Sequence, residues 1–363
     1  MNILFTSDLS GMGGGETSLL NICSVLKETN NIFALCAQRG TLVDLLEQMG
    51  IKTFVFDYRN KKRLPLTLLK IRRIVKENKI ECIHNNDPLT SVITWFSVFG
   101  LRRDNYWTCH GQWYDFGVIK KYLIKKANKH IFCVSTKVKE NLSRMGMLQT
   151  SVTYLGIPLE KYSNSIALNS FRKANGFDYN EIIIGAIGRF QPIKGQLKLI
   201  KAFEKVNKKI ERTRLVLVGG CIYNNAEERA YYNKCLDFVS ENNLSEKVIF
   251  LGERKNIPEI LKSFDVLVIP SDNESFGMVA IEAMAAGIPV LSTPNDGVSE
   301  ILEYKPELIA KTNDVDGLYD LMIKFFDKKT DMESIRSFLE RRSKRFDIEE
   351  IVLKYMNVFK NKA

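Results

Sequence analysis

The chain has 363 residues, and a prior of roughly 100 to 200 residues per domain predicts two domains rather than one. Its content of 45% hydrophobic and 26% charged residues excludes a disordered protein. The net charge of +11 is uneven, because residues 1–160 hold 22 Lys and Arg against 13 Asp and Glu, whereas the rest holds 31 against 29.

This uneven charge indicates that the N-terminal half meets an anionic partner, such as a membrane surface or a phosphorylated acceptor, unless it is only a solvated lysine-rich surface. No nucleic-acid-reading motif is present, so a nucleic-acid partner is not expected. The seven scattered cysteines and the lack of a signal peptide predict a cytoplasmic protein. Peripheral attachment to the inner face of the membrane is compatible with this location.

Short apolar runs alternate with amphipathic stretches of helical periodicity along the first half. This alternation is typical of βαβ units that build a parallel sheet. The runs predicted as strands are Asn2–Ser7, Ile32–Ala37, Thr53–Phe56, Cys82–His84, Tyr106–Cys109 and Ile131–Val134, followed by a short strand and turn within Thr153–Pro158.

The polar segment Tyr162–Asn175 lacks a strong pattern and is predicted as the linker. We therefore expect an N-terminal domain over residues 1–165 and a C-terminal domain over residues 176–346, with a last helix at about 347–361 that packs back on the first domain. A second series of strands is predicted at Ile182–Ile187, Leu215–Val218, Val248–Leu251, Val266–Ile269 and Pro289–Ser292. The fold class is thus α/β, with two doubly wound, Rossmann-like parallel-sheet domains whose ligands lie beyond the carboxyl ends of the strands, facing a central cleft.

A glycine-rich turn from Gly11 to Glu16 follows the first strand. Glycines there allow close approach of a ligand to the backbone, and the next helix offers free amides. A dinucleotide-binding fingerprint would place its third glycine at Glu16 and an acidic residue about 20 positions later. Neither is present, which argues against a nicotinamide dehydrogenase.

The loop Gly188–Gly195 follows the first strand of the second series and carries two cations, Arg189 and Lys194. Arg binds phosphate oxygens through a planar fork and Lys as a point charge, so the pair suits a diphosphate. Two solvated surface cations are the alternative.

The segment Pro270–Val290 predicts the end of a buried strand, a loop with Glu274, and a helix that ends at Gly287. Glu282 falls in the apolar interior of this helix, where a carboxylate needs either a polar pocket or a structural partner. Sugar and ribose hydroxyls are suitable partners for ionised carboxylates. The amides at the start of the helix suit a diphosphate.

These motifs together resemble the retaining glycosyltransferases of family 4, which have the GT-B architecture. The resemblance rests on Glu274 and Glu282 with seven residues between them, Gly188-Arg189-Phe190 with Lys194-Gly195, the glycine-rich turn, and Thr108-Cys109-His110-Gly111. It extends over nearly the whole chain through Val134-Ser135, Tyr154–Pro158, Val218–Gly220, Phe250–Gly252 and Asp296–Glu300.

The resemblance implies transfer of a hexose or N-acetylhexosamine from a nucleotide sugar, by family default a UDP-sugar, to a hydroxyl acceptor that is lipid-linked or a saccharide. It implies that Arg189 and Lys194 hold the diphosphate, Glu274 faces the sugar hydroxyls, Glu282 binds the ribose, and His110 lies near sugar and phosphate. His110, Arg189, Lys194 and Glu274 are the expected catalytic residues. Further donor contacts are expected from Gly14, Gly15, Gly188, Gly220, Arg254, Ser275, Phe276, Gly277 and Met278, and acceptor contacts from Gly13, Asp87 and Trp113.

The chain departs from the family at His84-Asn85-Asn86-Asp87, where many members have a second histidine. Asp87 is the candidate for a polar acceptor contact there, and His84 is interpreted as structural. Asp314-Val315-Asp316 resembles a metal-binding Asp-x-Asp only by its letters, because helix capping explains it more simply. No metal and no cofactor is expected. Another enzyme on the same fold, such as a sugar-nucleotide epimerase or a phosphorylase, is the alternative, and a basic nucleic-acid-binding protein is a distant one.

Overall fold

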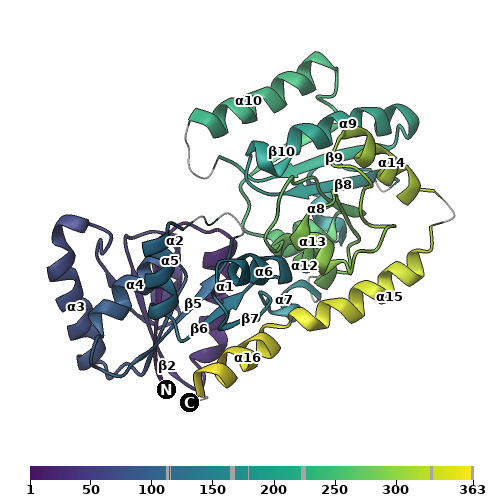
Figure 1. The fold of residues 1–363 in the computed structure, drawn as a ribbon. Coiled ribbons are helices and arrows are strands. Elements are labelled where there is room, and N and C mark those ends of the chain that lie inside the picture. The colour runs from purple at the N-terminus through teal and green to yellow at the C-terminus, as the bar shows by residue number, and fades with distance from the viewer. Residues whose placement is uncertain are drawn as a thin grey trace. The chain divides into compact units, whose positions relative to one another are not determined.

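A computed structural model describes residues 1–111, 114, 116–163, 168–178, 180–221, 226–327 and 330–360. The chain divides into two compact units (Figure 1). Unit 1 comprises Met1–Pro158 and Phe346–Ala363, and unit 2 comprises Leu159–Arg345. Within the described ranges, no helix has the length and apolar content needed to cross a bilayer.

Unit 1 contains a seven-stranded parallel sheet in the order β3-β2-β1-β4-β5-β6-β7. The strands are β1 (Asn2–Ser7), β2 (Asn31–Cys36), β3 (Lys52–Val55), β4 (Cys82–Asn85), β5 (Asp104–Cys109), β6 (His130–Cys133) and β7 (Thr150–Val152). The helices are α1 (Gly14–Leu26), α2 (Thr41–Gln48), the short 3-10 helix η1 (Lys61–Arg63), α3 (Leu64–Glu77), α4 (Pro88–Ser97), α5 (Val118–Ala127), α6 (Thr136–Arg144) and α16 (Ile348–Lys360).

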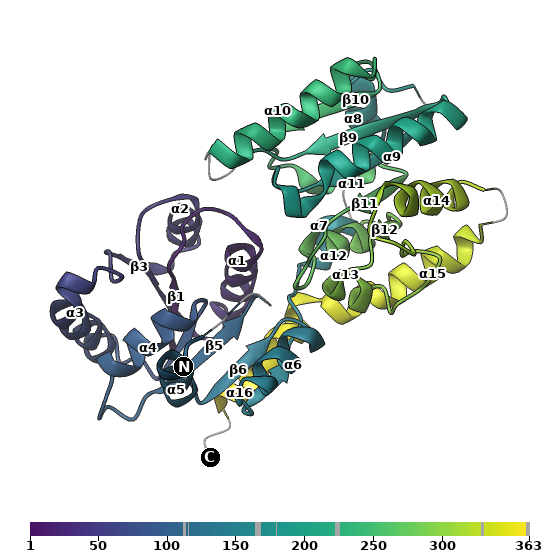
Figure 2. The same cartoon turned by 45° about the horizontal axis from the view of Figure 1, so that its top comes forward.

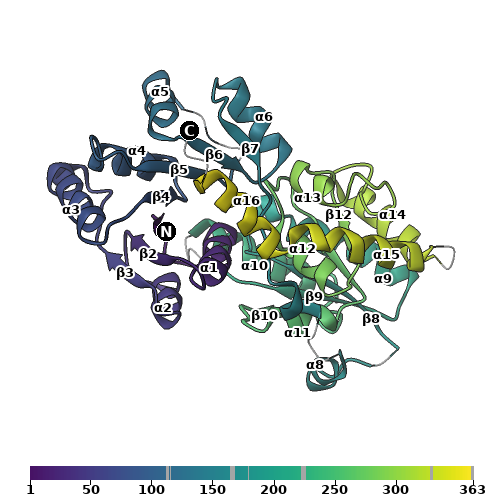
Figure 3. The same cartoon turned by 90° about the horizontal axis from the view of Figure 1, so that it is seen from below.

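The helices of unit 1 cover both faces of its sheet. Apolar residues of α1, α2 and α16 form one buried cluster with the sheet, and residues of α3 form a second cluster with β1, β2 and β4. Figure 3 shows α16, the last helix, lying beside α1. Since strands buried on both faces read as nearly continuous apolar runs, the two-sided cover explains the consecutive apolar residues Ile3, Leu4 and Phe5 of β1.

Unit 2 contains a five-stranded parallel sheet in the order β10-β9-β8-β11-β12. The strands are β8 (Ile182–Ile187), β9 (Thr213–Val218), β10 (Val248–Gly252), β11 (Val266–Ile269) and β12 (Val290–Ser292). The helices are α7 (Leu159–Ser163), α8 (Leu168–Ala174), η2 (Pro192–Lys194), α9 (Gln196–Lys209), α10 (Ala226–Glu241), α11 (Ile257–Lys262), α12 (Met278–Ala285), α13 (Asp296–Ile301), α14 (Val315–Phe325) and α15 (Met332–Ser343), with η3 (Lys344–Phe346) at the boundary between the units.

The α/β class with two parallel sheets is confirmed, but two local predictions differ from the structure. The last strand of unit 1 is Thr150–Val152, not a strand within Thr153–Pro158. The later residues leave the sheet because the Ile157 amide donates to the Phe346 carbonyl at 2.9 Å, where the C-terminal segment returns. The segment predicted as a linker, Tyr162–Asn175, includes the end of α7 and the whole of α8, and these two helices pack within unit 2 through contacts with α11 and α12.

Candidate functional site

Three loops at the carboxyl ends of β8, β9 and β10 interlock through their backbones. The Gly188 amide donates to the Val218 carbonyl at 2.9 Å, and the Phe190 amide donates to the Gly220 carbonyl at 3.1 Å. The Gly219 amide donates to the carbonyl of Gly252, the last residue of β10, at 2.9 Å. Gly188 and Gly220 therefore lie on one connected edge of the sheet, which is where parallel α/β sheets bind ligands.

Lys194 and Arg189 lie on the loop between β8 and α9. Gly195 ends the short helix η2 with φ +70°, and a Cβ at this position would lie 2.1 Å from the Pro270 carbonyl oxygen. Only glycine tolerates this approach. The tight turn brings the β8–α9 loop against the end of β11, and the Gln196 side-chain amide donates to the Arg189 carbonyl at 2.6 Å.

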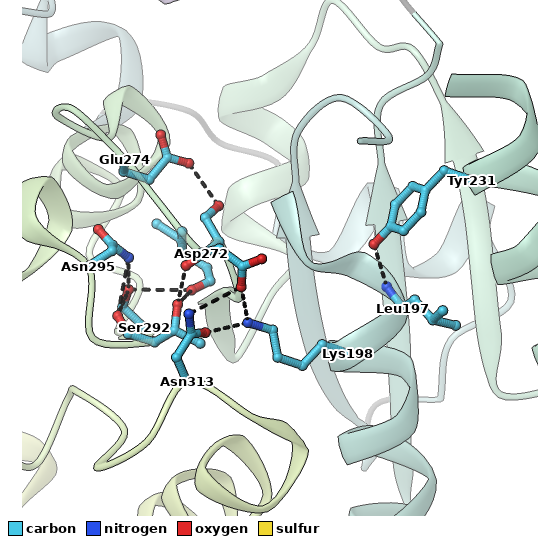
Figure 4. Close-up of polar contacts among 11 residues, drawn as sticks. Leu197, Lys198, Tyr231, Asp272, Glu274, Ser292, Asn295 and Asn313 are labelled. Atoms are coloured by element: carbon cyan, nitrogen blue, oxygen red, sulfur yellow. Dashed lines mark hydrogen bonds and ion pairs between the residues drawn. The ribbon is translucent and has the colours of Figure 1, made fainter. Parts of the chain in front are cut away.

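Glu274 and Lys194 form an ion pair across 80 residues of sequence. The distance from Lys194 Nζ to Glu274 Oε1 is 2.6 Å, and the two side chains are only 22% and 17% exposed. The Ser271 hydroxyl donates to the same Glu274 oxygen at 2.8 Å (Figure 4). A cation and a carboxylate are thus held together at the carboxyl edge of β8 and β11.

A second set of polar contacts holds the β11–α12 loop, which carries Glu274, in place. Lys198 Nζ contacts Asp272 Oδ1 at 2.5 Å and also donates to the side-chain oxygen of Asn313, while Asn313 Nδ2 donates to Asp272 Oδ1 at 3.1 Å (Figure 4). The Thr293 hydroxyl donates to the Ser271 carbonyl at 2.5 Å. Because these contacts join α9, the β11–α12 loop and the segment before α14, they fix the backbone on which Glu274 is carried.

Helix α12 begins after Gly277, whose φ of +115° favours glycine and whose Cβ would meet Val298 at 2.7 Å. Its N-cap residue, Gly277, has no side chain that could accept from the first amides, and the start of a helix favours an anion. Phe276 is buried and Met278 is half-buried. The buried hydroxyl of Ser275 has no hydrogen-bond partner among the described residues.

Glu282 lies on α12 and is 9% exposed. The Tyr162 hydroxyl of α7 hydrogen-bonds to its carboxylate, and Lys161 is close enough to favour the charged form. Burial outweighs both effects and raises the pKa of Glu282 to about 7. The structural partner of Glu282 is therefore the neutral hydroxyl of Tyr162. In the absence of ligand, the carboxylate takes up a proton near pH 7.

The glycine-rich turn of unit 1 opens α1, which starts at Gly14. The Gly13 amide donates to Glu16 Oε2 at 3.1 Å, so this donor is already engaged by the side chain of the third residue of α1. His110, which follows β5, lies against Gly15, where a Cβ would stand 3.6 Å from the imidazole ring. Asn86 links the two, because its Nδ2 donates to the Gly15 carbonyl at 3.2 Å and its Oδ1 lies 3.4 Å from His110 Nε2.

The imidazole of His110 is neutral near pH 7. Its removal from water lowers the pKa to about 4. Nδ1 is buried and has no hydrogen-bond partner among the described residues. The ring is therefore placed by Asn86 at one nitrogen, and the other makes no hydrogen bond among the described residues.

Two carboxylates lie near this turn. Asp87 Oδ1 accepts from the amides of Leu89 and Thr90, both at 2.9 Å, and caps α4, so one of its oxygens serves the helix. Asp8 follows β1, and burial, followed by the negative charge of Asp87, raises its pKa to about 6 against the opposing effect of Arg59. Trp113, the third predicted acceptor residue, lies outside the described residues.

Several sequence interpretations concern residues away from these loops. His84 is in the core, with Nε2 2.8 Å from the Thr108 hydroxyl, as the structural interpretation predicts. Asp314 caps α14 by accepting from the Gly317 amide at 2.7 Å, which confirms the capping interpretation. Arg254 is exposed two residues beyond β10.

Sequence reasoning missed Asp8, Asn86 and Tyr162 as parts of the site. Asp8 and Asn86 directly follow strand residues, and this position was an available signal. Tyr162 lies in the supposed linker, where nothing in the local pattern points to Glu282.

Comparisons with known proteins bear on the family and the fold of the chain. Residues 12–161 match the family model described as glycosyltransferase family 4, and residues 169–342 match that of glycosyl transferases group 1. The crystal structure of HepE from Anabaena in complex with UDP-glucose superposes with a TM-score of 0.86 and 22% identity, covering 99% of both chains. This likeness concerns the fold.

Two curated relatives match over different shares of the chain. An N-acetyl-alpha-D-glucosaminyl L-malate synthase from Bacillus anthracis is 27% identical over 53% of this chain, and the alignment spans about half of that protein, 49%. A UDP-Gal:alpha-D-GlcNAc-diphosphoundecaprenol alpha-1,3-galactosyltransferase from Escherichia coli is 24% identical over 83% of this chain and 81% of its own length.

Proposed function

The chain belongs to the glycosyltransferases of family 4 and group 1, and on that premise we propose that it moves a hexose or N-acetylhexosamine from a nucleotide sugar to a hydroxyl acceptor with retention. The observation that carries the proposal is the ion pair of Lys194 and Glu274 beside the uncapped start of α12. It combines a cation for phosphate, a carboxylate for sugar hydroxyls and the start of a helix at one sheet edge.

We assign the donor diphosphate to Arg189, Lys194 and the amides of Phe276, Gly277 and Met278. Glu274 accepts hydrogen bonds from the sugar hydroxyls. Glu282 accepts hydrogen bonds from the ribose hydroxyls once its hydrogen bond with the Tyr162 hydroxyl has moved or broken. Backbone groups around Gly220 and Arg254 receive the base. A UDP-sugar is the proposed donor, supported by the UDP-glucose complex of the similar HepE fold and by the name of the Escherichia coli relative.

Transfer breaks the bond between the anomeric carbon and the donor phosphate oxygen and forms one to the acceptor oxygen on the same face. The acceptor proton passes to the departing phosphate, so no protein nucleophile is required. Negative charge builds on the diphosphate, and its stabilisation by Lys194 and Arg189 is the main catalytic contribution. His110, as a neutral ring with Nδ1 unpaired among the described residues, orients sugar and phosphate. We propose that neither a metal nor a cofactor takes part.

The acceptor side is assigned to the turn at Gly13–Gly15, Asp87 and Trp113 of unit 1. We propose a lipid-linked or saccharide acceptor in cell-surface glycoconjugate synthesis, reached by a cytoplasmic enzyme attached peripherally to the membrane. The Escherichia coli relative, named for a diphosphoundecaprenol acceptor, supports the lipid-linked form.

Nucleotide sugars with uracil, guanine and adenine bases should be screened for their effect on the melting temperature of the purified protein, because a ligand that binds only the folded state stabilises it by mass action. The best donor is then incubated with candidate acceptors, and released nucleoside diphosphate and glycosylated product are measured. Conversion of the sugar without nucleoside diphosphate release would indicate the epimerase alternative instead.

A further inference from the structure

Most of the exposed large apolar side chains of unit 1 are on α3, α4 and α5, three neighbouring helices along one face of the sheet (Figure 2). On α5, Val118, Ile119 and Tyr122 are 82%, 76% and 61% exposed. Their spacing places them on one stripe of the helix, which continues into Lys125 and Lys126 in the last turn. An apolar stripe that ends in lysines is typical of helices that lie in a membrane interface.

A cavity of about 550 Å³ lies at the amino edge of the same sheet, where β5 and β6 begin. Arg103, Lys125, Lys126 and Lys129 line it. Asp104 is the one carboxylate among its lining residues, 2.9 Å from Lys129 Nζ. The lining therefore has a surplus of positive charge. Since His110 and the glycine-rich turn lie at the carboxyl edge, this cavity is separate from the candidate site of unit 1.

Asn128 also lines the cavity and is 4% exposed. Its Nδ2 donates to the Ile124 carbonyl at 2.8 Å and to the Ser91 hydroxyl at 2.9 Å. The carbonyl partner fixes which end of the amide is nitrogen. Oδ1 is left buried with no partner among the described residues, and a buried acceptor of this kind needs a donor such as a hydroxyl.

The cavity is continuous with an exposed apolar surface. Trp95 lines it, and its ring centroid lies 4.8 Å from that of Phe96 and 6.3 Å from that of Phe99. Phe99 is 70% exposed, and Leu148, which also lines the cavity, is 75% exposed. Cations for a phosphate and apolar side chains for acyl chains thus adjoin.

From these features we infer that the α4–α5 face of unit 1 docks on an anionic bilayer, with the phosphate and hydroxyl of one phospholipid headgroup in the cavity and Phe99, Ile119 and Tyr122 in the interface. The complementarity is between the cationic lining and the negative lipid surface. Helix α5 connects the carboxyl end of β5 to the start of β6, so its first residues lie toward the edge of the sheet that carries His110. A bilayer that covers the apolar stripe of α5 therefore extends toward His110. The inference deepens the proposed membrane attachment by naming its surface.

Sedimentation with vesicles of phosphatidylcholine, with and without phosphatidylglycerol, tests this surface. The protein should bind the vesicles that contain phosphatidylglycerol at low salt and leave them at high salt. The double variant K125Q/K126Q should bind roughly thirtyfold more weakly, at about 1 kcal/mol for each lysine near the surface. Ile119→Ser should also weaken binding.

Matched controls exist elsewhere in the chain. The pair Lys208 and Lys209 also occupies the last turn of a helix, so K208Q/K209Q removes the same charge, and Leu353→Ser changes an exposed residue of α16. Neither control should weaken binding. Equal losses from both lysine pairs, or equal binding to phosphatidylcholine alone, would overturn the inference. Stabilisation of each variant by a nucleotide sugar separates a failure of this surface from a failure of the proposed transfer.

Discussion

Glu282 shows how burial sets the charge of a single residue. Its raised pKa means that the folded protein holds a proton between about pH 4.5 and 7 that the unfolded chain has released. The contribution of this proton to the free energy of unfolding is fully present below about pH 4.5 and is lost as the pH rises to about 7. Glutamine resembles the protonated form at every pH.

We therefore expect Glu282→Gln to fold normally, with a melting temperature that rises relative to the native protein between pH 5 and pH 8. Donor affinity should fall by one to two powers of ten, because charge-assisted bonds to ribose are worth about 1.5 to 3 kcal/mol each at most. Melting and donor titration in the same buffers measure both. A variant that melts much lower and still binds donor normally would mark Glu282 as structural, where a loss of about 3 to 5 kcal/mol is expected.

Lys194 and Arg189 are proposed to stabilise the negative charge that builds on the departing diphosphate. Lys194→Ala and Arg189→Ala should each reduce turnover by about a hundredfold or more, the scale of losing one charge-stabilising donor. EDTA should have little effect on the native enzyme. Lys205→Ala is the control, because Lys205 lies on α9, which follows this loop, and pairs with Asp316 at the surface, so turnover should not change. Strict dependence on a divalent ion would contradict the metal-free mechanism.

At the scale of elements, the junction of β8 and α9 depends on one glycine. Gly195→Ala should destabilise unit 2 and lower donor affinity, since its Cβ would collide with the Pro270 carbonyl and displace Lys194. Gly176→Ala is the matched control, because Gly176 has a similar φ of +67° and no atom within 4 Å of its Cβ position. The control should lose only the left-handed backbone cost, roughly 1 to 2 kcal/mol. Equal losses in denaturant unfolding would show that the contact with β11 is unimportant.

At the scale of the whole molecule, the C-terminal helix completes the core of the N-terminal unit. Tyr355 is fully buried, its hydroxyl lies 3.0 Å from that of Thr108, and its ring packs against His84 and Phe132. Tyr355→Ala should cost about 3 to 5 kcal/mol of unit 1 stability. Leu353→Ala, on the exposed side of α16, should change stability by less than about 0.5 kcal/mol.

Hydrogen exchange of the two sheets measures this effect. Amides of β4 and β5 should lose protection in Tyr355→Ala, while those of β8 and β9 should keep theirs. Equal loss in both sheets would show that the units unfold together.

The sequence by itself determined the elements and the positions of the motifs. The strands Asn2–Ser7, Ile182–Ile187 and Val266–Ile269 were predicted to the residue, because an apolar run bounded by turn residues is a property of neighbouring positions. The same local signals identified Glu274, Lys194 and the start of α12.

Tertiary structure alone decided which of these groups meet. The pair of Lys194 and Glu274, the contact of Tyr162 with Glu282, and the link from Gly15 through Asn86 to His110 join segments that are far apart in the chain. Such contacts depend on the order in which strands pair and on which helix covers which face, whereas periodicity and turn chemistry report only the environment of each segment.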